Sequence, residues 1–337
     1  MRRTRRSCYN GPIASILVKK TARLAMNERD FYRQLTERIT EERGNHRMKV
    51  AFVGIGNMGK PMASNIARRG HEVFLFDANP AAAASAAKET GVTVLGRLSE
   101  ISVAEIIVTM LPDGNVVRDV ALGENGIAAA AKPGTIVVDM SSSQPLITRE
   151  TGAALALKKI TLIDAPVSGG VAKAVSGTLT IMIGGDDPAA IERVKPLLAC
   201  MGTTFFEVGK LGSGHAAKAL NNVVAAGNYA VLADALLVGE RYGIDRQMLV
   251  DIVNVSTGQS FISTVVMKQF VLPGTFNTGF AIGLLAKDAN IAAELSQGLG
   301  CRSPHIELTS RRWDEARDAL GGSADNSKAI EVWAKIQ

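Results

Sequence analysis

A glycine-rich turn directly after the first predicted strand most constrains the fold of this chain. Residues 49–54 (KVAFVG) form a short apolar run typical of a buried strand, and the spacing GxGxxG follows at Gly54, Gly56 and Gly59. The spacing alone is a weak signal, but here it opens a helical pattern that leads to a second predicted strand at residues 72–76. That strand–turn–helix–strand context is the one in which the motif binds a dinucleotide.

Each glycine has a physical role in such a turn. Gly54 would permit the tight turn, Gly56 the close approach of a pyrophosphate, and Gly59 the close packing of the helix on the strand. The helix N-terminus would add unpaired N–H groups and the positive end of its dipole. The alternative is a glycine-rich turn that binds nothing. We expect the whole turn to bind the cofactor: Gly54, Ile55, Gly56, Asn57, Met58 and Gly59.

An acidic residue then indicates which dinucleotide is bound. Asp77 ends the second predicted strand, 18 residues after Gly59, where a carboxylate accepts hydrogen bonds from the adenosine ribose hydroxyls. A carboxylate also repels a 2′-phosphate, and residues 78–80 (ANP) provide no Lys or Arg to bind one. NAD is therefore favoured over NADP. The alternative is that Asp77 merely begins a turn before Pro80, at the start of a helix.

Strands alternate with helical segments up to Gly209, and helices alone follow. The strands are predicted at residues 49–54, 72–76, 105–111, 135–140, 161–165, 179–185 and 204–209. Their alternation with Ala-rich helical patterns predicts a doubly wound, mainly parallel sheet. Residues 213–242 form one long pattern that is apolar nearly all round its central part, as in a helix buried among others. The predicted fold class is α/β, a Rossmann-type doubly wound parallel sheet followed by an all-α C-terminal domain.

Three segments follow from this pattern. We expect a basic N-terminal extension at residues 1–47, an NAD-binding domain at 48–211, and an all-α substrate and dimerisation domain at 212–337. Ser213 is the predicted N-cap of the long helix.

The N-terminal extension accounts for the basic character of the chain. Residues 1–47 hold 12 Lys and Arg against 5 Asp and Glu, whereas residues 48–337 hold 26 against 27. The extension could be a targeting peptide, although its acidic residues are unusual for one, a genuine basic arm, or an upstream over-extension of a reading frame that starts at Met48. The near-neutral remainder gives no reason to expect nucleic-acid binding.

Composition excludes several other classes. No 18-residue run is free of polar interruption, so we expect no membrane span. The three cysteines are far apart and odd in number, which fits a reducing compartment, and we expect a cytoplasmic location. The four histidines lack metal-ligand spacing, so we expect no metal.

Three further segments have chemistry to offer but are ambiguous by themselves. The turn at residues 168–170 (SGG) can present N–H groups and a hydroxyl to a carboxylate, or be a plain loop. Lys218 and Asn222 share one face of the long helix and would line a cleft, or lie in a solvated first turn. The adjacent pair Lys287 and Asp288, in a later helical pattern, is by itself typical of a surface.

Together these motifs resemble the β-hydroxyacid dehydrogenase family, which includes 3-hydroxyisobutyrate dehydrogenase and tartronate semialdehyde reductase. The resemblance covers residues 48–337. It rests on GIGNMGKPMA at 54–63, MLPDG at 110–114, VVDMSSSQP at 137–145, DAPVSGG at 164–170, GSGHAAKALNN at 212–222 and LLAKDANIA at 284–292.

The resemblance implies a role for each motif. Lys218 would be the catalytic acid/base, and Asn222 would hold the reacting hydroxyl or the carboxylate. The substrate carboxylate would be bound by Ser168, Gly169 and Gly170. Further cofactor contacts would come from Leu111 and Pro112 beside the adenosine, Ser142 near the nicotinamide, and Lys287 from the helical domain. The family also implies a homo-oligomer.

Two departures bear on the substrate. The family usually has Ser-Thr where this chain has Ser141 and Ser142, so packing near the nicotinamide would be looser. The related 6-phosphogluconate dehydrogenases have His-Asn where this chain has Asn221 and Asn222, which favours a short unphosphorylated substrate. Lys218 argues against the related imine reductases, which replace it.

The expected function is NAD-dependent hydride transfer from a short 3-hydroxy acid similar to 3-hydroxyisobutyrate. The alternative within the family is a reductase of tartronate or succinic semialdehyde. A distant alternative is a non-catalytic NAD-binding protein, which would be expected to lack Lys218 or the carboxylate-binding turn.

Overall fold

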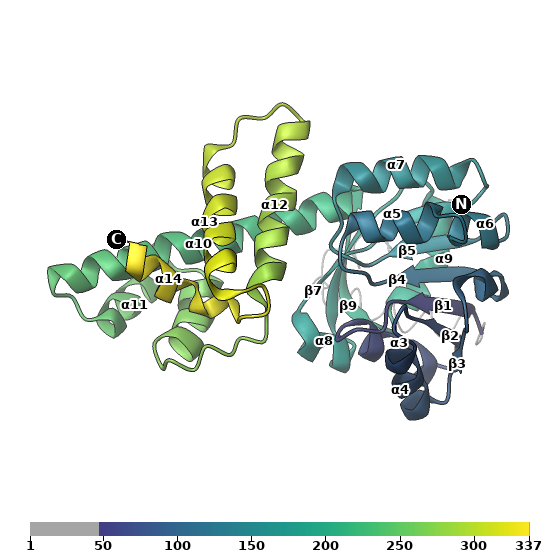
Figure 1. Ribbon diagram of the computed structural model, residues 1–337, viewed down its shortest axis with the longest axis horizontal. Coiled ribbons are helices and arrows are strands. Elements are labelled where there is room, and N and C mark those ends of the chain that lie inside the picture. Colours follow the sequence, from purple (N-terminus) through teal and green to yellow (C-terminus); the bar gives the residue numbers. More distant parts are fainter. Residues whose placement is uncertain (1–46, 337) are drawn as a thin grey trace, which may run out of the picture. The chain divides into compact units, whose positions relative to one another are not determined.

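The computed structural model describes residues 47–336, shown as ribbons in Figure 1. The predicted basic extension at residues 1–47 lies outside the described residues except for Arg47, and so do the alternatives for its role.

A single sheet forms the centre of the first part of the fold. Within the described residues, nine strands join in the order β3-β2-β1-β4-β5-β6-β8-β7, with β9 also paired to β8. In chain order the strands are β1 Lys49–Val53, β2 Glu72–Phe76, β3 Thr93–Val94, β4 Ile106–Thr109, β5 Ile136–Asp139, β6 Thr161–Asp164, β7 Val167–Ser168, β8 Leu179–Gly184 and β9 Gly202–Gly209. Pairing is parallel throughout except where β8 pairs with β6 and β7.

All seven predicted strands are present, which confirms the doubly wound, mainly parallel sheet. The two-residue strands β3 and β7 were not predicted. They contain too few residues to show an apolar run, and only their pairing with β2 and β8 defines them.

Helices cover both faces of the sheet (Figure 1). They are α3 Gly59–Arg68, α4 Pro80–Thr90, the 3₁₀ helix η1 Leu98–Val103, α5 Gly114–Leu122, α6 Ile127–Ala130, α7 Pro145–Ala156, α8 Gly170–Ser176 and α9 Pro188–Leu198. One buried cluster packs α3, α4, α8 and α9 on the sheet, and another packs η1, α5, α6 and α7. Strand β1 contributes Val50 and Phe52 to the first cluster and Ala51 and Val53 to the second, so both of its faces are buried.

Helices alone form the second part of the fold, as predicted. They are α10 Ser213–Tyr242, α11 Arg246–Asn254, the π-helix η2 Ile262–Val271, α12 Ile282–Gly298, α13 Pro304–Leu320, the 3₁₀ helix η3 Asn326–Lys328 and α14 Ala329–Ile336. The aromatic side chains of Tyr229, Trp313 and Trp333 meet edge to face at the centre of this part, with ring centroids 5.3–5.9 Å apart. Their polar atoms are satisfied by backbone carbonyls.

Helix α10 is the longest element described. Among residues 47–336 it is the one helix long and apolar enough to cross a membrane by length and composition, with a mean hydropathy of 1.4 over its 18-residue window. Its central part packs against α12 and α13 on one side, but Val224, Val231 and Val238 are exposed, so the helix is not buried all round as predicted.

The predicted N-cap of α10 is wrong. The helix does begin at Ser213, but the preceding Gly212 occupies the cap position with a positive φ of 87°, and no side chain of the cap accepts a hydrogen bond. Instead the carboxylate of Asp164, at the end of β6, accepts hydrogen bonds from the N–H groups of Gly212 (2.7 Å) and His215 (2.8 Å). The capping group therefore comes from the sheet, about fifty residues earlier in the chain, where local sequence could not indicate it. The last strand ends at Gly209 and α10 begins at Ser213.

Candidate active site

The glycine turn has the geometry expected of a dinucleotide site. Gly54 has a φ of 96°, and a Cβ there would lie 2.3 Å from the carbonyl oxygen of Met110. A Cβ on Gly59 would lie 1.9 Å from the carbonyl oxygen of Gly54, so helix α3 can approach β1 only with glycine there. Gly56 differs, because it is exposed and a Cβ there would meet no atom within 4 Å. The space above Gly56 is open to a ligand.

The start of α3 leaves room for an anion. The cap residue, Met58, makes no side-chain hydrogen bond to this helix end, and the first turn contains no acidic residue. Asn57 is exposed and Met58 is half-buried at this end, while Ile55 is buried behind them. Unpaired N–H groups at the positive end of a helix dipole are what a pyrophosphate requires.

Asp77 lies directly after β2 and supports the glycine turn. Its Oδ2 accepts a hydrogen bond from Ile55 N at 2.6 Å, and its Oδ1 accepts one from Asn79 N at 2.7 Å. Asn79 in turn caps α4 through Ala81 N. The turn-forming role of Asp77 is therefore real, and sequence reasoning missed its contact with the glycine turn. The same contact places the carboxylate beside the proposed cofactor site.

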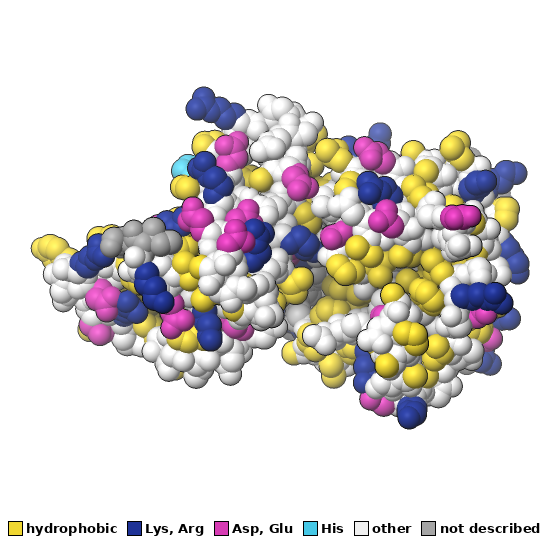
Figure 2. Space-filling model, viewed as in Figure 1, with side chains coloured by type: hydrophobic (Ala, Val, Ile, Leu, Met, Phe, Trp, Pro, Cys, Tyr) yellow, Lys and Arg dark blue, Asp and Glu magenta, His cyan; other side chains and the backbone are white. Residues whose placement is uncertain are grey.

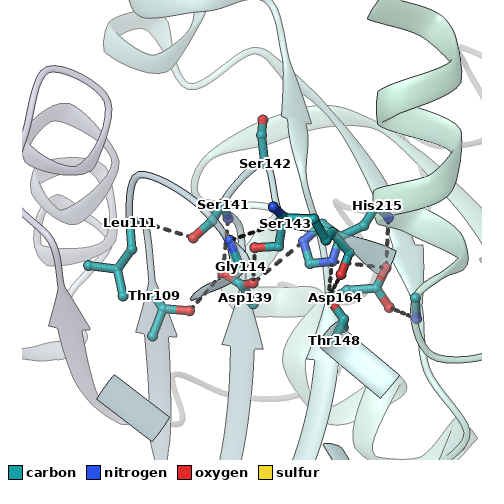
Figure 3. A network of polar contacts seen from close by, with 12 residues as sticks. Thr109, Leu111, Gly114, Asp139, Ser141, Ser142, Ser143, Thr148, Asp164 and His215 are labelled. Atoms are coloured by element: carbon teal, nitrogen blue, oxygen red, sulfur yellow. Dashed lines mark hydrogen bonds and ion pairs between the residues drawn. The ribbon is translucent and has the colours of Figure 1, made fainter. Parts of the chain in front are cut away.

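A second loop, which follows β5, is organised by a buried carboxylate (Figure 3). Asp139 Oδ1 accepts hydrogen bonds from Thr109 Oγ1 (2.9 Å) and Ser141 N (3.1 Å), and its Oδ2 accepts one from Ser143 Oγ (2.8 Å). The side chain of Ser142 points away from this carboxylate. We call residues 141–143 the serine loop.

The serine loop is also tied to the loop after β4. Ser141 Oγ accepts a hydrogen bond from Leu111 N at 2.9 Å. Leu111 in turn borders the glycine turn, because its Cδ2 would lie 3.0 Å from a Cβ on Gly54. Three segments far apart in the sequence, all predicted to contact the cofactor, therefore adjoin one another.

Lys287, on α12, reaches this group from the helical part. Its Nζ donates hydrogen bonds to the carbonyl oxygens of Pro112 (2.9 Å) and Ser142 (3.0 Å). The structure thus brings Lys287 together with Pro112 and Ser142, three residues assigned to the cofactor site by resemblance alone.

Asp288, which follows Lys287, lies in the interior. Its side chain is only 6% exposed, and Oδ2 accepts a hydrogen bond from Asn222 Nδ2 at 2.6 Å. Its Oδ1 lies 3.3 Å from Lys287 Nζ, at ion-pair distance, but accepts no hydrogen bond. The surface interpretation of the Lys287–Asp288 pair is therefore wrong. A charged residue inside an otherwise apolar helical run was the available signal.

Lys218 lies one turn before Asn222 on α10. Its amine has no hydrogen-bond or ion-pair partner within residues 47–336. Burial lowers the pKa of Lys218 below its ordinary value, and the charge of Lys287 acts in the same direction, while the charge of Asp288 opposes them. A half-buried amine with a lowered pKa, and with no such partner among the described residues, is suited to general acid/base chemistry.

The turn at Ser168, Gly169 and Gly170 connects β7 to α8. Gly169 and Gly170 have positive φ values of 132° and 67°, and both are exposed, while Ser168 is half-buried. The aliphatic chain of Lys173 packs over Gly169. Among the residues described, the turn makes no hydrogen bond to Lys218 or Asn222, so the structure does not join it to them.

Other potential sites are distinct from this one. A cavity of about 930 Å³, lined by residues that include Arg149, Lys159 and Lys210, contains none of the predicted site residues. Within residues 47–336, no group of three His, Cys, Asp or Glu side chains is placed to hold a metal ion. On the face shown in Figure 2, basic and acidic side chains are interspersed.

Comparison with known proteins agrees with this arrangement. Residues 49–209 match the family model described as the NAD binding domain of 6-phosphogluconate dehydrogenase, and residues 212–333 match the NAD-binding domain of NADP-dependent 3-hydroxyisobutyrate dehydrogenase. The chain is 35% identical to 2-(hydroxymethyl)glutarate dehydrogenase of Eubacterium barkeri over 289 residues, which covers 86% of this chain and 96% of the relative. It is 34% identical to 2-hydroxy-3-oxopropionate reductase of Escherichia coli, covering 85% and 97%.

A solved structure shows the same fold. Mycobacterium tuberculosis 3-hydroxyisobutyrate dehydrogenase with L-serine superposes with a TM-score of 0.79 at 32% identity, covering 85% of this chain and 99% of that one. The fold and the matches together define an oxidoreductase with an NAD(P)-binding domain. The chain belongs to the β-hydroxyacid dehydrogenase family, and the predicted family and fold class are confirmed.

Proposed function

We propose that this chain transfers a hydride between NAD and a short 3-hydroxy acid similar to 3-hydroxyisobutyrate, with Lys218 as the general acid/base. The single observation that supports this most is the position of Lys218. Lys218 is half-buried, its amine has no hydrogen-bond or ion-pair partner among residues 47–336, and its pKa is lowered; it lies one turn from Asn222 on the helix that meets Asp288.

The cofactor would be held from both parts of the chain. The glycine turn would bind the pyrophosphate, Asp77 the adenosine ribose, and the loops containing Leu111 and Ser142 would border the adenosine and the nicotinamide. The open space above Gly56 and the uncapped start of α3 fit such a group. NAD would supply the hydride acceptor for the alcohol carbon. Lys287, by holding Pro112 O and Ser142 O, would fix the two loops rather than bind the cofactor through its amine alone.

The proton moves through Lys218. During oxidation, the neutral amine takes the proton of the substrate hydroxyl as the hydride leaves the carbon that bears this hydroxyl. During aldehyde reduction, the protonated amine returns that proton to the oxygen. The lowered pKa increases the neutral fraction near neutral pH, which is the form that oxidation needs.

The remaining polar groups would orient the substrate. The exposed turn at residues 168–170 would accept the carboxylate in its N–H groups, and Asn222 would hold the hydroxyl or the carboxylate. Asp288 accepts one hydrogen of the Asn222 amide, which leaves the other free to be donated to the substrate. The same groups serve a semialdehyde reductase, so tartronate or succinic semialdehyde remains the second candidate substrate.

A substrate panel tests the proposal. Purified protein would be incubated with short hydroxy acids and NAD, or with semialdehydes and NADH, while NADH absorbance is followed. Turnover of at least one member is expected. Absence of turnover across the panel, with NADH still bound, would favour a non-catalytic NAD-binding protein.

We further propose a cytoplasmic homo-oligomer without a membrane or nucleic-acid partner. The exposed face of α10 supports the oligomer, because Val224, Val231 and Val238 recur every seven residues and are 62%, 71% and 62% exposed. A repeated, exposed row of apolar side chains is typical of a surface that another chain covers.

A further inference from the structure

A histidine lies between two buried carboxylates where the sheet meets α10 (Figure 3). His215 Nε2 is 3.5 Å from Asp139 Oδ2, and Nδ1 is 3.8 Å from Asp164 Oδ2. All three side chains have no exposed surface. The proposed chemistry uses none of them, and burying ionisable groups is costly unless they pair with one another.

The hydrogen bonds of Thr148 fix one side of the imidazole. Thr148 Oγ1 lies 3.1 Å from Gln144 O and 2.9 Å from His215 Nδ1, so a hydrogen bond links its hydroxyl to that nitrogen, with the donor set by the tautomer of the ring. The other nitrogen, Nε2, is buried, has no hydrogen-bond partner among residues 47–336, and faces Asp139. This contact is attractive only with a proton on Nε2.

The contact of His215 with Asp139 links the imidazole to the serine loop. Asp139 holds the backbone of Ser141 and the hydroxyl of Ser143, and so sets the position of Ser142 between them. Ser142 is the residue proposed to adjoin the nicotinamide, and its carbonyl oxygen also receives Lys287.

His215 and Asp164 also fix the start of α10. His215 lies in the first turn of this helix, and its backbone N–H, like that of Gly212, is bound by Asp164. Lys218 follows three residues later, on the same side of the helix as His215. Close packing makes this turn rigid, since a Cβ on Gly214 would lie 2.3 Å from Met182 O.

We propose that His215 is a positioning residue that couples the serine loop to the turn of α10 bearing Lys218. Through Asp139 it fixes the place where hydride is received, and through the helix it fixes the amine that handles the proton. This inference rests on the proposed function. The reaction removes a hydride and a proton from one alcohol group, so the serine loop and the Lys218 amine must stay at a fixed separation. Misplacement by about 1 Å can cost about 10²-fold in rate.

Two substitutions separate the two contacts of the ring. His215→Asn puts an amide where Nδ1 lies, so it keeps the bond to Thr148 and loses the contact with Asp139. His215→Gln extends an amide towards Asp139. The matched control is Tyr229→Phe, which removes the buried hydrogen bond from Tyr229 to Ser327 O in the helical core, away from the site.

The main measurement is the rate of the hydride step in a single turnover, with the best substrate of the panel, protonated or deuterated at the alcohol carbon. His215→Asn should slow this step on the order of 10–10²-fold and increase the isotope effect on kcat, with NADH affinity nearly unchanged. His215→Gln should recover most of the rate. Tyr229→Phe should lower the Tm and leave the isotope effect as in the wild-type protein. A merely structural role for His215 would make His215→Asn behave like Tyr229→Phe, and that result would overturn the proposal.

Hydrogen exchange provides a second test that needs no turnover. In His215→Asn with NADH bound, amides in the serine loop and in residues 213–218 should both lose protection, whereas Tyr229→Phe should leave both unchanged. Loss of protection in residues 213–218 alone, or unchanged protection in both segments, would contradict the coupling. If the wild-type protein turns over no substrate, the proposed function fails, and hydrogen exchange still decides whether His215 couples the two segments.

Discussion

Asn222 donates a hydrogen bond from its side-chain amide to Asp288, with 2.6 Å between Nδ2 and Oδ2. The contact joins α10 to α12 one turn beyond Lys218. The preceding residue, Lys287, donates hydrogen bonds to Pro112 O and Ser142 O in the two proposed cofactor loops. One short segment of α12 therefore contacts both the proposed substrate amide and these loops. The proposed chemistry therefore depends on α12 as much as on α10.

Lys218→Ala should remove most turnover and leave NADH affinity intact. The amine is the proposed proton carrier, whereas the pyrophosphate would be bound by the glycine turn in the other part of the chain. Loss of a positioned acid/base costs on the order of 10²–10⁴-fold in rate. Steady-state kinetics with NADH binding followed by fluorescence would measure both effects. The control is Lys210→Ala, an exposed lysine outside the site, which should change neither. A nearly normal kcat in Lys218→Ala would exclude the proposed mechanism.

Asn222→Ala should lower kcat/KM through poorer substrate positioning rather than lost proton transfer. The pH dependence of the residual activity should therefore resemble that of the wild-type protein. A changed pH profile would instead assign Asn222 a part in proton transfer.

Oxidation and reduction should depend on pH in opposite directions. Oxidation needs neutral Lys218, so kcat/KM for oxidation should rise as pH rises through the lowered pKa of Lys218. Reduction needs the protonated amine, so kcat/KM for reduction should fall over the same range. Asp288→Asn removes a charge that raises this pKa, so both limbs should move to lower pH. Asparagine can still accept the Asn222 hydrogen bond, which separates the effect of charge from that of position. Profiles that stay fixed or move to higher pH would contradict the assignment.

Asp77 should set a preference for NAD, measured as the ratio of kcat/KM with the two cofactors. Asp77→Asn keeps an oxygen to accept the hydrogen bond from Ile55 N and removes the charge that would repel a 2′-phosphate. Asp77→Asn should therefore reduce the ratio of kcat/KM with NAD to kcat/KM with NADP, without disturbing the glycine turn. Combining Asp77→Ser with Ala78→Arg should improve use of NADP further. A wild-type preference for NADP would show that the interpretation of Asp77 is wrong.

The exposed valine face of α10 (Val224, Val231 and Val238) should form the interface between copies of the chain. Val231→Glu places a charge at its centre and should shift the mass in light scattering towards the 35.6 kDa of one chain. Val255→Glu is the control, because Val255 is 87% exposed and lies after α11, outside helix α10. An unchanged mass in Val231→Glu would place the interface elsewhere.

Local sequence was sufficient for the longer elements and for the geometry of the glycine turn. The seven longer strands are apolar runs whose period is visible in sequence, and the roles of Gly54 and Gly59 follow from a spacing of a few residues. Such features depend on neighbouring residues, so a single chain can reveal them.

The buried carboxylates could not be predicted in the same way. Asp164 caps a helix that starts 49 residues later, Asp139 accepts a hydrogen bond from Thr109 on a neighbouring strand, and Asp288 meets Asn222 on another helix. In sequence each is an acidic residue at a strand end or in a helical pattern, where solvation is the ordinary expectation. Only the packing of distant elements makes them interior acceptors. For the same reason Ser213 was assigned a capping role that Asp164 performs.

The edge-to-face cluster of Tyr229, Trp313 and Trp333 makes the helical part optically distinct. The chain contains two tryptophans, and both are in this cluster. Intrinsic tryptophan emission therefore reports on the helical core alone, whereas far-ultraviolet circular dichroism senses the whole polypeptide. In a urea titration, coincident curves from the two signals would mean that the sheet and the helices melt as one cooperative unit, and separated curves would give each its own midpoint.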